Sequence, residues 1–260
     1  MNPTLEVLFS PAEWRALSAG DLTGTVCVVV DVLRASSAFV TALAHGAEAV
    51  VPVASIAEAL EQRARRPDVL LAGEREGRRI GAALTGGVEF DLGNSPREFT
   101  SERVAGRLIV STTTNGTGAL RACAGASGVL VASWLNVSAT VAELEGRFGG
   151  LAETARVLVV CAGTGEGAAL EDTLLAGALA AALAVALPGL ELLDSAEIAR
   201  AAYAGAREDL VGTVRRARNA RRLLAHPELR DDVAFCLQRD RFPIVAGLDA
   251  AGWVRRLPAG

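Results

Sequence analysis

The sequence predicts an α/β protein with three layers, α/β/α, around a largely parallel or mixed β-sheet. Short apolar runs rich in Val, Ile and Leu alternate with longer Ala-rich runs of helical periodicity along most of the 260 residues. The run Val26–Val30 is almost continuously apolar and β-branched, which is typical of a strand covered by helices on both faces. These two patterns favour successive βαβ units with right-handed crossovers.

The first third of the chain carries this rhythm most clearly. We expect an opening strand at 5–9 and a short helix near Trp14. The next elements are expected to alternate, as strand 25–31, helix 37–45, strand 48–53, helix 55–66 and strand 69–72. Ser36 and Ser37 are candidate N-caps of the helix at 37–45, and Ser55 with Glu58 forms a capping-box pattern for the helix at 55–66.

The pattern breaks between Gly73 and Thr100, where the sequence is rich in glycine and charge and lacks periodicity. A loop of this length in a compact domain is usually functional or disordered, and its Gly-Glu-Arg and Gly-Asn-Ser-Pro motifs favour a function. The rhythm then resumes, with strands expected at 107–111, 128–133, 156–161, 244–248 and 253–257, and helices at 118–124, 137–148, 168–187, 195–206, 208–224 and 228–238. No linker interrupts the chain, so we expect one domain over 1–260, with room for two sub-lobes of about 1–135 and 136–260 on a shared sheet.

The composition limits the kinds of partner that the protein can have. The net charge is −4 and the isoelectric point about 5.4, which argues against a nucleic-acid-binding protein. The N-terminus lacks the pattern of a signal peptide, and the most apolar stretch, 168–187, carries Glu171 and Asp172 and is expected to be a buried helix. We therefore expect a cytoplasmic protein without a membrane partner, for which a homodimer is compatible with the sequence. The arginine run 215–222 is expected to form a solvated face or an interface.

The residue types that the chain lacks exclude several chemistries. It contains no lysine, so it has neither a P-loop lysine nor a lysine that could form a Schiff base. Its four cysteines lie far apart without a C-x-x-C pair, and it has two histidines. Zinc sites, disulfide frameworks and histidine-rich metal sites are not expected, so a bound metal would need oxygen ligands.

Four loops that follow predicted strands carry acidic, basic or hydroxyl side chains. They contain Asp31 with Arg34, Glu74 with Arg75, the run 112–117, and the glycine loop 163–167 with Glu171 and Asp172. Because loops after parallel strands gather at one edge of a sheet, we expect these groups to meet. Carboxylates about 4 Å apart repel by roughly 4 kcal/mol per pair at an effective dielectric near 20, and Mg²⁺ would remove that repulsion. The acids could bind a metal ion, and the arginines, hydroxyls and amides could bind an anion. Together these groups predict a site for a small anionic phosphoester.

Each motif alone also has a structural interpretation. Asp31 and Arg34 could form an ion pair that stabilises a turn, and the run 112–117 could itself be a simple turn. Glu171 and Asp172 would be favoured in a first helical turn by the helix dipole alone. The occurrence of all four motifs at strand ends is what favours a common site.

Two other functions remain open from the residues. Gly163-x-Gly165-x-x-Ala168 follows the strand expected at 156–161 and fits the G-x-G-x-x-A fingerprint of a dinucleotide-binding oxidoreductase. That interpretation leaves the motifs at 31–34, 73–75 and 112–117 unexplained. A non-catalytic protein that binds an anion in the same pocket is the other alternative.

Several motifs follow one another in a specific order: Asp31-Val-Leu-Arg-Ala-Ser-Ser, Gly73-Glu-Arg, Gly93-Asn-Ser-Pro, Thr112-Thr-Thr-Asn-Gly-Thr, Cys161-Ala-Gly, and Glu171-Asp with Ala176-Gly. From about Val26 to Cys236 this order resembles the 2-phosphosulfolactate phosphatase family, the ComB-like fold. One departure is visible, because Glu89-Phe90-Asp91 stands where the family commonly has Gly-Phe, after a longer loop at 78–87. That loop is a candidate for contact with the substrate.

The resemblance implies Mg²⁺-dependent hydrolysis of (R)-2-phospho-3-sulfolactate to sulfolactate and phosphate, a step toward coenzyme M. We expect the metal to be held by Asp31, Glu74, and Glu171 or Asp172, and the oxyanion to be clamped by Arg34 and Arg75. The remaining anionic groups are expected to bind Asn94, Ser95, Thr113, Thr114, Asn115, Gly116 and Thr117. The expected nucleophile is a metal-activated water, because Leu33 and Gly167 stand where aspartyl-phosphate and cysteinyl-phosphate routes would need a second acid and an arginine.

Overall fold

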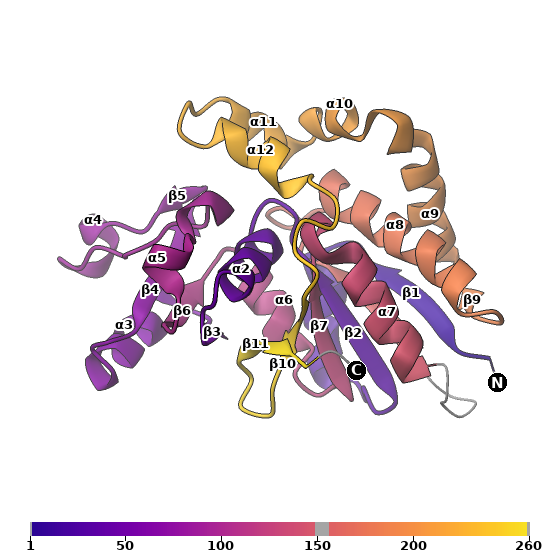
Figure 1. Ribbon diagram of the computed structural model, residues 1–260, viewed down its shortest axis with the longest axis horizontal. Helices are drawn as coiled ribbons and strands as arrows, with labels where there is room; N and C mark the ends of the chain where they lie inside the picture. Colours follow the sequence, from indigo (N-terminus) through magenta and orange to yellow (C-terminus); the bar gives the residue numbers. More distant parts are fainter. Residues whose placement is uncertain (1, 149–155, 259–260) are drawn as a thin grey trace.

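The computed structural model describes residues 2–148 and 156–258 as three layers, with helices on both faces of one mixed sheet (Figure 1). The strands of the described residues are ordered β5-β4-β6-β3-β11-β10-β7-β2-β8-β1-β9. Their bounds are β1 Thr4–Leu8, β2 Thr25–Val30, β3 Ala49–Pro52, β4 Leu70–Arg75, β5 Arg78–Arg79, β6 Leu108–Thr112, β7 Gly128–Ala132, β8 Arg156–Cys161, β9 Glu191–Leu192, β10 Val245–Leu248 and β11 Val254–Leu257. The predicted α/β class with a mixed sheet is confirmed.

The helices cover the sheet from both sides because both faces of its central strands are apolar. Their bounds are α1 Pro11–Arg15, α2 Ala35–Ala44, α3 Ile56–Arg65, α4 Ala82–Thr85, α5 Ser101–Val104, α6 Gly116–Ala122, α7 Val137–Phe148, α8 Leu170–Ala186, α9 Asp194–Ala206, α10 Leu210–Arg215, α11 Arg218–Leu224 and α12 Arg230–Cys236. Val26, Val28 and Val30 of β2 join the apolar core beneath α7 and α8, whereas Cys27 and Val29 join the core beneath α2 and α6. Every residue of β2 is buried, as the continuous apolar run predicts.

A C-terminal hairpin joins two groups of parallel strands into one sheet. β4, β6 and β3 form one parallel group, and β7, β2, β8, β1 and β9 form the other. β10 and β11 pair with each other and with the flanking strands β7 and β3, always antiparallel. The division into sub-lobes stays a prediction, although the sheet itself is continuous through this hairpin.

The three antiparallel steps through the hairpin make the two parallel groups run in opposite directions. In a flat sheet, the carboxyl ends of β2 and β4 would therefore lie at opposite edges. Adjacent strands rotate by roughly 20–25°, so the six steps from β4 to β2 turn the strand direction by on the order of 130°. This twist brings the ends of β4 and β6 round toward the end of β2. The expectation that the four loops gather at one edge of a parallel sheet is therefore wrong, although the loops after β2, β4, β6 and β8 do meet.

Most predicted elements are present close to their expected bounds, with three corrections. α2 begins at Ala35, so Ser36 and Ser37 lie inside it, and the carboxylate of Asp31 accepts a hydrogen bond from the Ala35 N–H (3.2 Å). β4 continues to Arg75, because the segment past the apolar run still pairs with β6 and β5. The helix expected at 208–224 is broken at Ala217, whose backbone is extended, into α10 and α11.

The C-terminal helices α10, α11 and α12 lie beyond one end of strands β2 and β7 (Figure 1). They contact one another, and α12 also contacts the short 3-10 helix at 96–98. We call α10–α12 the helical arm. Within the described residues, no helix combines the length and the apolar character that crossing a bilayer requires.

Candidate active site

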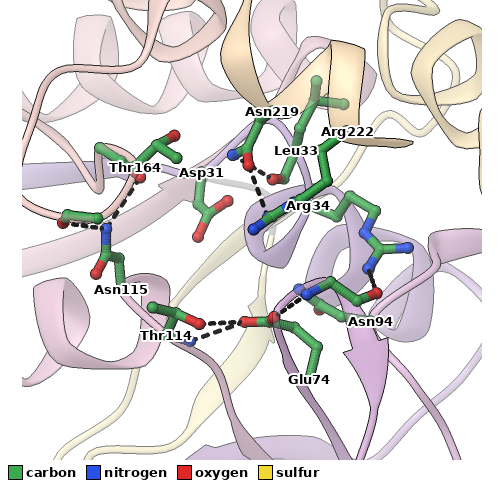
Figure 2. Close-up of a pocket in the computed structure, with 13 residues that line it drawn as sticks. Asp31, Leu33, Arg34, Glu74, Asn94, Thr114, Asn115, Thr164, Asn219 and Arg222 are labelled. Atoms are coloured by element: carbon green, nitrogen blue, oxygen red, sulfur yellow. Dashed lines mark hydrogen bonds between the residues drawn. The ribbon is translucent and has the colours of Figure 1, made fainter. Parts of the chain in front are cut away.

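A small cavity lies where the ends of β2, β4, β6 and β8 meet helix α11 (Figure 2). We call it the inner cavity, and its volume is about 50 Å³. The residues that line it are Asp31, Leu33, Arg34, Glu74, Gly77, Asn94, Thr114, Asn115, Gly163, Thr164, Gly165, Asn219 and Arg222. Residues from both ends of the chain therefore contribute to one site, as the four sequence motifs predict in part.

Asp31 follows β2 directly and is half-buried at the wall of the inner cavity. Burial raises the pKa of its carboxyl to about 7. The nearby Glu74 and Glu171 contribute to the rise, and the hydrogen bond from Ala35 opposes it. At the start of α6, a Cβ added to Gly116 would lie 2.5 Å from Asp31 Oδ2, so only glycine lets this helix approach the carboxylate. Asp31 is therefore an acid whose charged form would gain from a neighbouring cation.

Glu74 is a second carboxylate on the cavity wall, and it is held in one orientation. Its Oε1 accepts hydrogen bonds from the backbone N–H and the hydroxyl of Thr114 (2.9 and 2.8 Å), and its Oε2 accepts one from the N–H of Gly77 (2.8 Å). The side chain is 6% exposed. These bonds link the ends of β4 and β6 and hold the carboxylate of Glu74 on the cavity that Asp31 also lines (Figure 2).

Arg75 does not reach the inner cavity, contrary to its predicted place on the oxyanion. Successive side chains of a strand point to opposite faces, so Arg75 faces away from the side on which Glu74 lies. Its guanidinium donates to the carbonyl of Glu74 (2.6 Å) and to the hydroxyl of Thr112 (3.1 Å). The structure gives Arg75 a place in holding β4 against β6.

The loop between β6 and α6 is divided between the cavity and its own helix. Thr114 and Asn115 line the cavity, and Asn115 Nδ2 donates to the carbonyls of Gly163 and Gly165 (3.1 and 3.0 Å). Thr113 and Thr117 instead bond to each other, since the N–H of each donates to the hydroxyl of the other (3.3 and 3.1 Å). Of this predicted set, the structure places two side chains on the cavity.

Arg34 forms a buried ion pair that the sequence did not reveal. Its Nη1 donates to Asp232 Oδ2 (2.8 Å) and its Nη2 to the carbonyl of Gly77 (2.6 Å). Asp232, on α12, is fully buried and also accepts a hydrogen bond from the hydroxyl of Ser95 (2.7 Å). Ser95 is thus held by Asp232 and does not line the inner cavity, whereas the neighbouring Asn94 does. The guanidinium of Arg34 faces the cavity with part of its charge already neutralised.

Glu171 and Asp172 lie buried behind the cavity wall rather than on it. Asp172 Oδ1 accepts from the N–H of Val32 (2.8 Å) and Oδ2 from the N–H of Gly163 (3.1 Å), so this carboxylate ties together the loops after β2 and β8. Burial raises the pKa of Asp172 well above its ordinary value, and the charge of Asp31 adds to the rise. Burial also raises the pKa of Glu171, whose Oε1 has no partner among the described residues.

The predicted four-carboxylate site is therefore not assembled as one cluster. In residues 2–148 and 156–258, no three His, Cys, Asp or Glu side chains are arranged to hold a metal ion. Two of the four predicted acids, Asp31 and Glu74, face the inner cavity together. Mg²⁺ is usually bound by one or two carboxylates, with water and substrate oxygens completing its shell, so this pair fits the ion chemically.

Helix α11 supplies two residues of the cavity that the sequence interpretation missed. Asn219 Nδ2 donates to the carbonyl of Leu33 (3.1 Å), and Arg222 Nη2 donates to Asn219 Oδ1 (2.7 Å). Arg218 of the same helix donates to the carbonyl of Thr164. The arginines of the run are exposed, as predicted, but the run is not solely a solvated face. The spacing of Asn219 and Arg222, three residues apart on one helical face, is the signal that could have identified them.

The glycine loop after β8 does not favour the dinucleotide interpretation. The N–H of Gly163 already donates to Asp172, and the carbonyls of Gly163 and Gly165 are engaged by Asn115. The first turn of the following helix, α8, carries the buried acids Glu171 and Asp172. These acidic side chains occupy the helix N-terminus at which a dinucleotide would place its pyrophosphate.

Comparison with known proteins points to one family. The family model described as 2-phosphosulpholactate phosphatase matches residues 14–250. A relative from Symbiobacterium thermophilum, named probable 2-phosphosulfolactate phosphatase, is 41% identical over 225 residues, which cover 85% of this chain and 89% of the relative. Relatives with the same name from Thermotoga petrophila and Caldanaerobacter subterraneus are 38% and 36% identical over 85% and 90% of this chain, and over 88% and 92% of their own lengths.

Proposed function

Because the chain belongs to the 2-phosphosulfolactate phosphatase family, we propose that it hydrolyses (R)-2-phospho-3-sulfolactate to sulfolactate and phosphate in the presence of Mg²⁺. In this proposal the reaction is a step toward coenzyme M. The observation that supports it most directly is the inner cavity, which combines two carboxylates with amide, hydroxyl and guanidinium donors. That combination suits a metal ion beside a phosphate oxyanion.

The proposed metal ligands are Asp31 and Glu74. Both are oxygen donors on the same cavity, and the charge of Glu74 contributes to the raised pKa of Asp31. When bound, Mg²⁺ would offset negative charge on the phosphoryl oxygens and make a water molecule more acidic. The buried Glu171 and Asp172 would lie behind these ligands, where Asp172 would hold the loop that carries Asp31.

The donors of the cavity would bind and orient the phosphate. Asn94 and Arg222 are polar side chains at its wall, and Thr114 holds Glu74 in place. Arg34 can offer its remaining N–H groups to an oxyanion while Asp232 keeps its guanidinium fixed. Preorganised donors of this kind stabilise the charge that develops during phosphoryl transfer without having to move.

Two further parts of the proposal concern the location and the oligomeric state of the protein. All four cysteines are free thiols, which agrees with the reducing cytoplasm that we propose as its location. A homodimer stays a prediction, which light scattering of the purified protein would test.

The proposed function is tested by phosphate release from a panel of phosphoesters with and without Mg²⁺. The panel contains phosphosulfolactate, phospholactate, phosphoglycolate and 3-phosphoglycerate. We expect the highest kcat/KM for phosphosulfolactate and little release after a chelator has removed divalent cations. Release from none of the four, in the presence of Mg²⁺, would contradict the proposal and favour a protein that binds the anion without hydrolysing it.

A further inference from the structure

A second and much larger cavity opens beside the inner one. We call it the outer cavity, and its volume is about 490 Å³. It shares Arg34, Gly77 and Asn94 with the inner cavity. The rest of its wall consists of Arg78, Arg79, Gly93, Glu98, Glu228 and Leu229. The two cavities are therefore neighbouring chambers separated by residues of the site itself.

The inner cavity is too small for a substrate that carries several acid groups. A volume of about 50 Å³ has room for roughly four water molecules, at about 10–15 Å³ each in this measure. Such a volume suits a phosphate group and a metal ion in contact with it, and it leaves no room for the rest of the substrate. The organic part of a phosphoester that reacts there must extend past the shared wall, and the outer cavity is the space that adjoins it.

The charges in the outer cavity suit a second anionic group. Among the described residues, Arg78 and Arg79 make no ion pair or hydrogen bond through their guanidinium groups, whereas Arg34 is paired with Asp232. Glu98 is engaged by the N–H of Gly93 (3.0 Å) and lies within ion-pair distance of Arg103. In the described part of the wall, the guanidinium groups of Arg78 and Arg79 and the carboxylate of Glu228 are thus left without partners.

The pairing register of β5 with β4 shows which of Arg78 and Arg79 lies on the same face as the inner cavity. Arg79 pairs with Glu74 across the β4–β5 ladder, and Arg78 pairs with Arg75. Residues paired directly across an antiparallel ladder lie on the same face, so Arg79 shares the face of Glu74, which lines the inner cavity. Arg79 is therefore the better placed of the two to contact a group attached to the bound phosphoester.

We propose that the outer cavity binds a second strong acid group of the substrate, of the sulfonate class, and that Arg79 and Arg78 determine this specificity. The proposal rests on the proposed function, since it extends the same site. A planar guanidinium can donate two parallel hydrogen bonds to a sulfonate, and the shared wall fixes the distance between this group and the phosphate.

A matched pair of substrates tests the proposal. Phospholactate keeps the phosphate and the carboxylate of phosphosulfolactate and replaces the sulfomethyl group by a methyl group. We expect Arg79→Ala to lower the ratio of kcat/KM for phosphosulfolactate to kcat/KM for phospholactate about tenfold, through KM, which is the scale of one charge-assisted hydrogen bond at a partly exposed site. Arg78→Ala should lower the same ratio about threefold.

Two further variants sharpen the test. Arg215→Ala is the matched control, because Arg215 is exposed, its guanidinium makes no hydrogen bond or ion pair within the described residues, and it lies on α10 outside both cavities. Glu228→Gln should shift the ratio the other way, since it removes a negative charge that opposes the sulfonate. A ratio that Arg79→Ala leaves equal to that of the control would overturn the proposal.

A binding measurement separates this proposal from the proposed function. Calorimetric titration with sulfolactate and with lactate needs no turnover. If the protein releases no phosphate, the proposed function fails, and the outer cavity is still tested by whether Arg79→Ala weakens sulfolactate binding relative to the wild type. If the wild type hydrolyses phosphosulfolactate but binds sulfolactate no better than lactate, the outer cavity is not a sulfonate site and the proposed function stands.

Discussion

The inner cavity is enclosed by two regions that are held in different ways. One region, which we call the sheet side, carries Asp31, Glu74 and Thr114 on strand ends fixed by the β2–β8 and β4–β6 ladders. The other is the helical arm, whose helices have six or seven residues and are too short to be stable alone. In the proposed function, the sheet side would supply the negative charge for a cation, and the arm would supply groups that close the cavity over an anion.

The arm is attached to the sheet side by a small number of polar contacts. Asn219 bonds to the carbonyl of Leu33, and Asp232 binds both Arg34 and Ser95. Each contact joins residues more than a hundred positions apart in the sequence. A single substitution can therefore loosen the arm without disturbing the ladders, and this difference lets the two regions be tested separately.

The largest effect is expected on the sheet side, from Asp31→Asn. The amide oxygen of asparagine can still accept the hydrogen bond from Ala35, so the fold should persist. The loss of the negative charge should lower Mg²⁺-dependent phosphate release on the order of 10³-fold. Steady-state kinetics and circular dichroism measure the two properties together. Asp68→Asn, at an exposed acid outside the cavity, is the control, and an unchanged rate in Asp31→Asn would remove Asp31 from the site.

The next largest effect is expected where the arm meets the sheet side, from Asp232→Ala. This substitution leaves Arg34 buried without its ion-pair partner, which typically costs about 3–5 kcal/mol of folding free energy. A protein of this size loses about 2–4 °C of melting temperature for each kcal/mol, so calorimetry should record a fall of roughly 10 °C.

The neighbouring acid provides the control for this prediction. The side chain of Asp231 is 64% exposed and lies 3.7 Å from Arg97, so Asp231→Ala should change the melting temperature by little. Equal melting temperatures for the two variants would show that the arm does not depend on the buried pair.

These two regions also explain how much of the site could be predicted from the sequence. Asp31 directly follows the apolar run of β2, and Thr114 lies two residues after the end of β6, so local sequence alone places both close to strand ends. Asp232 and Asn219 carry no such signal, because their place in the site arises only when the arm docks on residues about 200 positions away.

The error at Arg75 has a different cause. The apolar run of its strand ends at Ala72, so the sequence suggested a loop from Gly73 onward in which Glu74 could face a metal ion and Arg75 an anion. The strand in fact continues to Arg75, because its backbone pairs with β6 as far as Gly73 and with β5 at Glu74 and Arg75. Pairing with a neighbour extends a strand beyond its hydrophobic pattern, and the resulting alternation sends these two side chains to opposite faces.

A smaller effect is expected from the part of the arm that would face the anion in the proposed function. Arg222→Ala removes a guanidinium from the wall of the inner cavity without touching the ladders. We expect KM for phosphosulfolactate to rise about tenfold and kcat to fall less, because the group would contribute mainly to binding. Arg221→Ala is the matched control on the same helix, since Arg221 is exposed and does not line the cavity. A fall in kcat with constant KM would instead assign Arg222 to the stabilisation of the transition state.

The smallest effect is expected on the pH dependence of stability, measured in the absence of divalent cations. Burial raises the pKa of Asp31 to about 7, above its ordinary value near 3.8, so the folded protein holds more protons than the unfolded chain between these two pH values. In the absence of divalent cations, the free energy of unfolding should therefore decrease as the pH rises from about 4 to about 7. The raised pKa of Asp172 acts in the same direction.

We expect the melting temperature of the cation-free protein to be a few degrees lower at pH 8 than at pH 5.5, given about 2–4 °C for each kcal/mol. Asp31→Asn should reduce this difference, because the amide does not ionise, and Mg²⁺ added at pH 8 should raise the melting temperature of the wild type but not of the variant. Differential scanning calorimetry of both proteins at both pH values measures each effect. If Mg²⁺ raised both melting temperatures equally, the cation would bind away from Asp31, and the sheet side would lose its proposed role as the metal-binding region of the cavity.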